Sequence, residues 1–136
     1  LTMKDWHTNS ECEDAILKQD KNAGQKFYII ECGKSGVCVA SWRKRVMLAK
    51  GRYRLQAAVR AQNLAPLKDG APWGVSLRIA GAEPTRRFED TKTMQPLTFE
   101  FQIVETFQFV ELVAEMRSSR GEARFDADAF KLVKLP

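Results

Sequence analysis

The chain has 136 residues, enough for one domain with a sizeable hydrophobic core, and no hydrophobic run in it is long enough for a transmembrane helix, so we expect no membrane insertion. It carries 22 lysine and arginine residues against 17 acidic residues, a net charge of +5. The basic residues are spread along the sequence, which favours a solvated basic surface over a site for nucleic acid or another polyanion.

The first predicted element is a short helix over residues 10–18, "SECEDAILK". Ser10 with Glu13 three residues later resembles a capping box, in which the two side chains satisfy backbone donors at the start of a helix. No segment after residue 27 has a helical period, so the rest of the chain is expected to consist of strands.

Residues 33–35, Gly-Lys-Ser, match the end of a phosphate-binding loop. The complete loop has an earlier glycine at the position of Tyr28, and it runs into a helix. Here β-branched and aromatic residues follow, which are typical of a strand. We therefore expect no nucleotide site, and predict two strands joined by a turn in which Gly33 and Gly36 supply positive φ angles.

The cysteines lie beside this turn. Cys32 and Cys38 flank it and could face each other across a hairpin at disulfide distance, which would leave Cys12 over. Alternatively, Cys12 pairs with one of the other two, or all three are small buried hydrophobic side chains in a reducing compartment. A structural zinc site is not expected, because three cysteines and the single histidine, His7, lack the paired spacing of such sites.

The later segments alternate between apolar and polar residues with a period of two, as half-buried strands do. The last segment, residues 122–135, is expected to contain a bulge near Ala129 that brings Phe130 and Leu132 inward. With turns between them, about eight strands predict an all-β fold, an antiparallel β-sandwich. The positions expected to face inward are Tyr53, Leu55, Ala57, Val59, Ala61, Val75, Leu77, Ile79, Leu97, Phe99, Phe101, Ile103, Val110, Leu112, Ala114 and Met116, and the outward positions include Gln56, Ser76, Arg78, Glu111 and Glu115.

Two segments carry a more specific pattern. One is "GRYRL" (residues 51–55), which follows a strand ending in "VML", and the other is the closing "FDADAFKL" (residues 125–132). Together they resemble the galactose-binding-domain-like jelly rolls, the fold of many carbohydrate-binding modules in secreted bacterial enzymes. The resemblance covers residues 37–135. It implies that residues 1–136 form one jelly-roll domain, a piece of a larger extracytoplasmic protein.

The resemblance also implies a structural calcium, held between an N-terminal acidic residue and an aspartate on the last strand. Asp126 or Asp128 matches that aspartate. Calcium takes about six to eight oxygen ligands, some of them from the backbone. Alternatively, both aspartates pair with Arg124, Lys131 or neighbouring arginines on a solvated face. The acidic residues available as the N-terminal partner are Asp5, Glu11, Glu13 and Asp14.

Modules of this kind stack an exposed aromatic side chain on the apolar face of a pyranose ring. Trp73, in the loop sequence "DGAPWG", is the candidate for stacking, and Arg78 and Gln56 are candidates for hydrogen bonds to the sugar. Alternatively, Trp73 covers the open end of the sandwich. Trp6 and Trp42 are weaker candidates, and Trp42, in a predicted strand, is expected in the core.

Catalysis is not expected. Glu111 and Glu115 could form a carboxylate pair for glycoside hydrolysis, but residues four apart on one strand lie about 13 Å from each other, too far for either usual geometry. Ion pairs with arginines on neighbouring strands explain both glutamates more simply. His7 has no serine or cysteine partner at a nucleophile elbow.

The sequence therefore predicts a non-catalytic carbohydrate-binding module. The alternative is a structural or protein-interaction domain of the same fold that binds no sugar and presents an apolar patch. A third hypothesis is polyanion binding through "WRKR" (residues 42–45), where alternation would place Arg43 and Arg45 on one face and Lys44 on the other. Such binding would weaken steeply with added salt.

Overall fold

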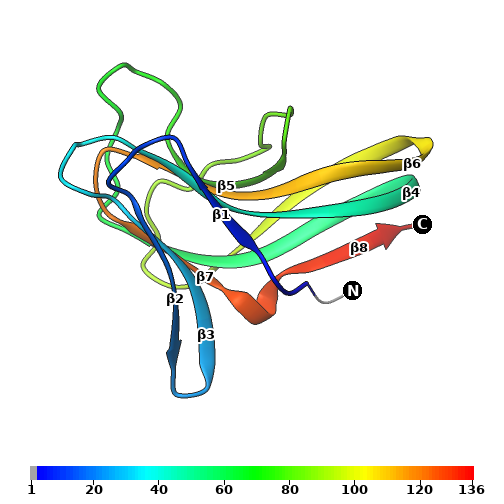
Figure 1. The fold of residues 1–136 in the computed structure, drawn as a ribbon, viewed down its shortest axis with the longest axis horizontal. Helices are drawn as coiled ribbons and strands as arrows, with labels where there is room; N and C mark the ends of the chain where they lie inside the picture. The colour runs from blue at the N-terminus through cyan, green and yellow to red at the C-terminus, as the bar shows by residue number, and fades with distance from the viewer. Residues whose placement is uncertain (1–2) are drawn as a thin grey trace.

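The computed structural model describes residues 3–136, and its eight strands form one antiparallel sheet, which confirms the all-β prediction (Figure 1). The strand order is β2-β3-β7-β4-β6-β5, and β1 and β8 also pair with β4. Within residues 3–136, no helix is long and apolar enough to cross a membrane. The elements are β1 (His7–Ser10), β2 (Ile16–Asn22), β3 (Gln25–Glu31), β4 (Cys38–Gln62), β5 (Gly74–Ile79), β6 (Gln95–Ser118), β7 (Glu122–Asp126), the 3-10 turn η1 (Ala127–Ala129) and β8 (Lys131–Leu135).

Two long strands, β4 and β6, fold this sheet over on itself. A straight strand of 25 residues would span roughly 80 Å, whereas the radius of gyration expected for a domain of this length is only about 14 Å. The ladder between β4 and β6 shifts register between Ala49 and Gly51, where residues 104–106 of β6 are left opposite Lys50. Such bulges bend strands, and both strands double back at the same end of the molecule (Figure 1). The strand ending in "VML" and the "GRYRL" segment are therefore parts of one continuous strand, with a bulge between them.

The fold-over produces two layers that pack face to face. The β5 layer contains β1, residues 38–49 of β4, residues 107–118 of β6, and β5, and the β7 layer contains the remaining strands. Trp42 of the β5 layer joins them: its ring lies 4.5 Å from that of Tyr28 on β3, and its Nε1 donates a hydrogen bond to the carbonyl of Ile29 at 3.2 Å. The predicted β-sandwich is therefore confirmed.

The predicted inward positions are buried or half-buried, and their side chains fill the space between the layers. Phe130 and Leu132 are also buried, as expected, although the segment before them is a 3-10 turn instead of a bulge. Two of the predicted outward positions, Ser76 and Glu115, are buried on the outer face of the β5 layer, so their predicted exposure is wrong. The Glu115 side chain is 3% exposed, because arginine side chains cover it.

The predicted helix over residues 10–18 is also wrong. This segment is the end of β1, a loop, and the start of β2, which pairs with β3. Polar side chains hold the loop: the Ser10 hydroxyl accepts a hydrogen bond from the N–H of Cys12 at 3.2 Å, and the Asp14 carboxylate accepts two from Ser35, at 2.7 and 2.8 Å. Such local bonds compete with helix formation.

The Gly-Lys-Ser segment is a turn, but not the turn of a hairpin. It carries the chain from β3 in the β7 layer to β4 in the β5 layer, because β3 pairs with β2 and β7 and not with β4. Gly36 has the predicted positive φ, 79°. Gly33 does not, so that prediction is wrong. A side chain at Gly33 would instead collide with Asp14, which binds Ser35 of the same turn.

Candidate functional site: a groove on the β7 layer

Three hollows of about 440, 370 and 260 Å³ lie along the outer face of the β7 layer. The first two share Gln62 and Asn63 at the end of β4. Arg60, which lines the third hollow, lies two residues before Gln62 on the same face of β4. With the Gln62 amide oriented so that its oxygen faces Arg60, that oxygen accepts a hydrogen bond from the Nη2 of Arg60 at 2.7 Å. We call the three hollows together the β7-face groove. Their lining residues are Asn22, Gln25, Phe27, Glu31, Cys32, Arg60, Ala61, Gln62, Asn63, Asp90, Thr91, Lys92, Met94, Gly121, Glu122 and Arg124.

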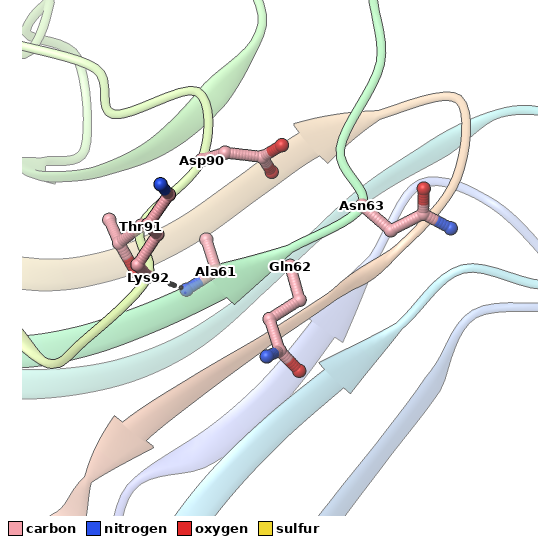
Figure 2. A pocket seen from close by; sticks show the side chains of 6 residues that line it. All are labelled: Ala61, Gln62, Asn63, Asp90, Thr91 and Lys92. Atoms are coloured by element: carbon pink, nitrogen blue, oxygen red, sulfur yellow. Dashed lines mark hydrogen bonds between the residues drawn. The ribbon is translucent and has the colours of Figure 1, made fainter.

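One wall of the groove is the segment before β6. The Ala61 N–H donates to the Thr91 hydroxyl, and the Thr91 N–H donates to the Ala61 carbonyl, both at 2.9 Å. Asp90 adds a bond from the N–H of Leu64 at 3.0 Å. Figure 2 shows the Asp90 carboxylate directed toward the chain at Asn63, and the Gln62 amide extending over β7, where Gln62 is paired with Glu122. The segment before β6 is therefore held by hydrogen bonds to the end of β4.

The opposite wall is the β2–β3 hairpin, which contributes the aromatic side chain of the groove. Phe27 is half-buried, and the guanidinium of Arg124 lies 5.9 Å from its ring centroid. Arg124 is held in place by Glu122 at 3.2 Å and by Asp20 at 3.5 Å. Gln25, at the end of the hairpin, donates to an Asp126 carboxylate oxygen at 3.2 Å.

The groove lining is polar and balanced in charge. Three cationic side chains face three carboxylates, and four amide side chains lie among them. Amides and guanidinium groups are planar and offer several hydrogen-bond positions each. The arrangement thus combines an apolar ring with planar polar groups at no net charge. The charged residues are Arg60, Lys92, Arg124, Glu31, Asp90 and Glu122, and the amides are Asn22, Gln25, Gln62 and Asn63.

The structure does not bring the three predicted sugar-binding residues together. Gln56 lies on the groove side of β4, but outside the three hollows. Arg78 lies on the outer face of the other layer, where its Nε and Nη2 bind the two oxygens of Glu115 at 3.2 and 3.0 Å. Trp73 is half-buried and packs against the core just before β5. Trp42 is buried, as predicted.

The outer face of the β5 layer carries a closed charge network. Glu115 binds Arg117 at 3.1 Å as well as Arg78, and Glu111 binds Arg43 at 2.8 Å. The predicted pairing of both glutamates with arginines is therefore confirmed. Burial favours the neutral acid, but the hydrogen bonds and charges of Arg78 and Arg117 hold the pKa of Glu115 below its ordinary value. The same contact raises the pKa of Arg78.

The residues predicted to hold calcium have other contacts. Asp126 caps the 3-10 turn by accepting the N–H of Asp128 at 3.0 Å. Asp128 lines a hollow of about 250 Å³ together with Asp5, Lys4 and Lys26. In the part of the chain that the structure describes, no three His, Cys, Asp or Glu residues form a group able to hold a metal ion. The calcium site stays a prediction of the resemblance.

The residues of the β7-face groove were not predicted from the sequence, although the alternation of residues along β4 indicates one of them. Extending the predicted outward alternation past Arg60 leads to Gln62, the residue common to two hollows. Phe27 was hidden, because β2, the strand that pairs with β3, overlaps the helix predicted over residues 10–18. Nothing local to residues 90–94 predicts that they fold against the end of β4.

No family model and no curated protein matches the sequence. Solved structures match in fold. A protein from Bacteroides thetaiotaomicron described as sugar-binding has a TM-score of 0.64 at 11% identity, covering 99% of this chain and 90% of that one. A family 61 carbohydrate-binding module in complex with β-1,4-galactotriose has a TM-score of 0.56 at 13% identity, covering 98% and 91%. The fold is that of carbohydrate-binding modules.

An enzyme also contains this fold. The enzymatically active domain of tailspike protein 4 from bacteriophage CBA120 matches with a TM-score of 0.61 at 7% identity. The match covers 94% of this chain and 19% of that one. At such identities the likeness establishes the jelly roll alone, so the role of each residue has to come from its surroundings.

Proposed function

We propose that this domain is a non-catalytic, extracytoplasmic module that binds carbohydrate in the β7-face groove. The observation that carries the proposal is the composition of the groove, where a half-buried aromatic ring adjoins planar polar side chains in a hollow surface. Binding sites are typically concave, with apolar contact area and a few polar groups that fix orientation. The carbohydrate-binding modules that share the fold support the ligand class.

Phe27 supplies the apolar contact. The C–H face of a pyranose ring would pack on Phe27 and Met94, because both line the hollow between the hairpin and the wall before β6. Arg60 and the amide of Gln62 would bind hydroxyl groups further along the groove. Once a ligand covers these polar groups, a sugar with a hydroxyl in the matching position is favoured, since a covered donor without a partner is costly.

The charge balance of the groove favours a neutral glycan. Each carboxylate in it already has a donor: Glu31 pairs with Lys18 at 3.1 Å, Glu122 with Arg124 at 3.2 Å, and Asp90 with the Leu64 N–H. These contacts also give the carboxylates structural roles in place of acid or base roles. We therefore expect binding that changes little with added salt, in contrast to binding of a polyanion.

A glycan panel tests this proposal. The purified chain is exposed to neutral and acidic oligosaccharides, including β-1,4-galactotriose, with calcium and with a chelator. We expect selective binding to neutral glycans, and a loss on chelation would support the calcium site near Asp128. Arg60→Ala should remove binding, whereas Arg54→Ala, on the same strand face but paired with Glu100 outside the hollows, should retain it. A panel without any binding would contradict the proposal.

A second candidate function is docking to a neighbouring domain of the same polypeptide. The observation that favours it is an apolar patch at the fold-over, where Phe107 and Phe109 are 65% and 58% exposed and Met47 pairs with Phe109. Val104 lies on the same bend. An exposed group of large apolar side chains is typical of contact surfaces. Substitution of both phenylalanines by serine would abolish such docking and leave glycan binding unchanged.

A further inference from the structure

The three cysteines belong to three different segments of the chain and lie close together at one end of the sandwich. Cys32 follows β3 in the β7 layer, and its thiol lies 3.7 Å from the carbonyl of Ser118. Ser118 is the residue of β6 paired directly with Cys38 of β4. On the other side of β4, Ser10 of β1 is paired with Ala40, and the N–H of Glu11 donates to the carbonyl of Val39 at 2.9 Å, which places Cys12 beside Cys38. Cys38 therefore lies between Cys12 on one side and Cys32 on the other.

Two contacts hold the Cys12 loop in this position. The Cys12 sulfur lies 3.4 Å from the Ser10 hydroxyl. Asp14 binds both the backbone N–H and the hydroxyl of Ser35, which belongs to the turn between Cys32 and Cys38. The loop and the turn thus form one unit, and the meeting of the three thiols is built into the fold.

The three thiols differ in accessibility. Cys38 is fully buried, and the neighbouring Cys32 side chain, together with burial, raises the pKa of its thiol. Cys12 and Cys32 are half-buried, and Cys32 also lines the β7-face groove. A thiolate is the reactive form in exchange, so the two half-buried cysteines are the ones that solvent oxidants reach first. The same residues do not form a metal-binding group within residues 3–136.

We propose that Cys38 is a redox site shared by two partners: oxidation joins it to Cys32, and the neighbouring Cys12 can exchange into that disulfide. In the first step the thiols of Cys32 and Cys38 lose two protons and two electrons to a disulfide oxidant such as oxidised glutathione, which is reduced to two thiols. In the second, the Cys12 thiolate attacks the Cys38 sulfur, forming the Cys12–Cys38 bond and releasing Cys32 as a thiolate.

The two disulfides have different effects. The bond between Cys32 and Cys38 joins the two layers beside the groove, because these residues belong to different layers. The bond between Cys12 and Cys38 ties the N-terminal loop to β4 and leaves the Cys32 thiol free at the groove. It also closes a longer loop, which restricts the unfolded chain more strongly. The redox state is thereby linked to the surface of the groove.

Peptide mapping tests the pairing. The reduced chain is oxidised with oxidised glutathione, remaining thiols are blocked with N-ethylmaleimide, and linked peptides are identified by mass spectrometry. We expect Cys38 in every intramolecular disulfide. Cys12→Ser should yield the Cys32–Cys38 link alone, and Cys32→Ser the Cys12–Cys38 link alone. A dominant Cys12–Cys32 link, or three unreacted thiols, would overturn the proposal.

The exchange step has a separate test that needs no substitution at the buried position. Wild-type chain carrying one disulfide is freed of oxidant, incubated at mildly alkaline pH, and sampled over time. Two starting samples are compared, one richer in the Cys32–Cys38 disulfide and one richer in the Cys12–Cys38 disulfide. The ratio of the two linked peptides should approach the same constant value in both samples. If each starting mixture keeps its own ratio, Cys12 does not exchange and this part of the proposal is wrong.

Discussion

The outer faces of the two layers carry similar side chains, but they use them differently. On the β5 layer, Arg78 and Arg117 converge on one buried carboxylate, that of Glu115. On the β7 layer, Arg60 is exposed and binds an amide, and the charged groups around it border hollows of up to about 440 Å³. Alternating polar residues on a strand therefore do not by themselves make a binding surface.

The difference comes from what flanks each face. On the β7 layer, the β2–β3 hairpin and the segment from Asp90 to Met94 lie on either side of β7 and β4 and line the hollows. On the β5 layer, a hollow of about 240 Å³ lies beside Leu67 and Arg117, but over Ser41 and Glu115 the arginine side chains lie directly on the sheet. We therefore expect substitutions on the β5 layer to change stability, and those in the groove to change binding.

The largest effect is expected for Glu115→Gln. Removing one partner of a buried ion pair leaves Arg78 without its counter-charge, which costs about 3 kcal/mol of unfolding free energy. Urea denaturation measures this loss. Glu111→Gln is the matched control, since its side chain is 25% exposed and its loss should stay below about 1 kcal/mol. Equal losses for the two variants would mean that the difference in burial between the two ion pairs has no effect on their contribution to stability.

Trp73→Ala should act on stability and not on binding. Its half-buried ring packs against the core, so truncation should cost about 2 kcal/mol, less than for a fully buried aromatic. Thermal denaturation and glycan affinity measured on the same sample separate the two roles. An unchanged melting temperature with lost binding would restore Trp73 as the sugar-stacking residue.

Phe27→Ala should weaken glycan binding at least tenfold, or about 1.4 kcal/mol, because it removes the apolar platform of the groove. Isothermal titration calorimetry with the best neutral ligand measures the change. The matched control is Phe109→Ala, an exposed phenylalanine on the other layer. If the control loses affinity and Phe27→Ala keeps it, the site lies on the apolar patch.

Acid should weaken the β5 layer through Glu115. Because its pKa is lower in the folded state than in the unfolded chain, its contribution is complete above the unfolded value of about 4.3 and is lost as pH falls through the folded value. The unfolding free energy should thus decline below about pH 4, and less so in Glu115→Gln. Parallel pH curves for the two proteins would assign the decline to other carboxylates.

The smallest effect on folding is expected at the apolar patch. Replacing Phe107 and Phe109 together by serine should change stability by less than about 0.5 kcal/mol, since both rings are exposed. Urea denaturation of the variant and of the wild type measures this difference. A large loss of stability would mean that the patch supports the fold-over of β4 and β6.

Periodicity predicted the layers well, because burial on one face repeats every second residue. It placed Leu55 and Met116 in the core, where both are fully buried. It could not show that β4 is one strand, since the bulge at Gly51 looks like a turn in sequence. The burial of Glu115 was equally hidden, because it depends on Arg78 from a strand paired with it only in three dimensions.

The residues of the candidate site, the β7-face groove, were harder to predict from the sequence. Three elements distant in sequence, around Phe27, Gln62 and Asp90, define the groove, and their meeting depends on the pairing of β3, β7 and β4. Trp73, a loop tryptophan, was the candidate for stacking that the sequence offered, and its half-buried ring packs against the core. Local chemistry identified suitable residue types, and only the strand order decided which of them share a surface.

The most direct test of the groove is chemical-shift mapping by NMR. The ¹⁵N-labelled chain is titrated with the best neutral oligosaccharide of the panel, with β-1,4-galactotriose as the first probe. We predict that the largest shifts fall on the amides of Phe27, Gln62 and Thr91, while those around Arg78 stay unchanged. Shifts concentrated on the β5 layer or at Phe107 and Phe109 would contradict a binding site in the β7-face groove.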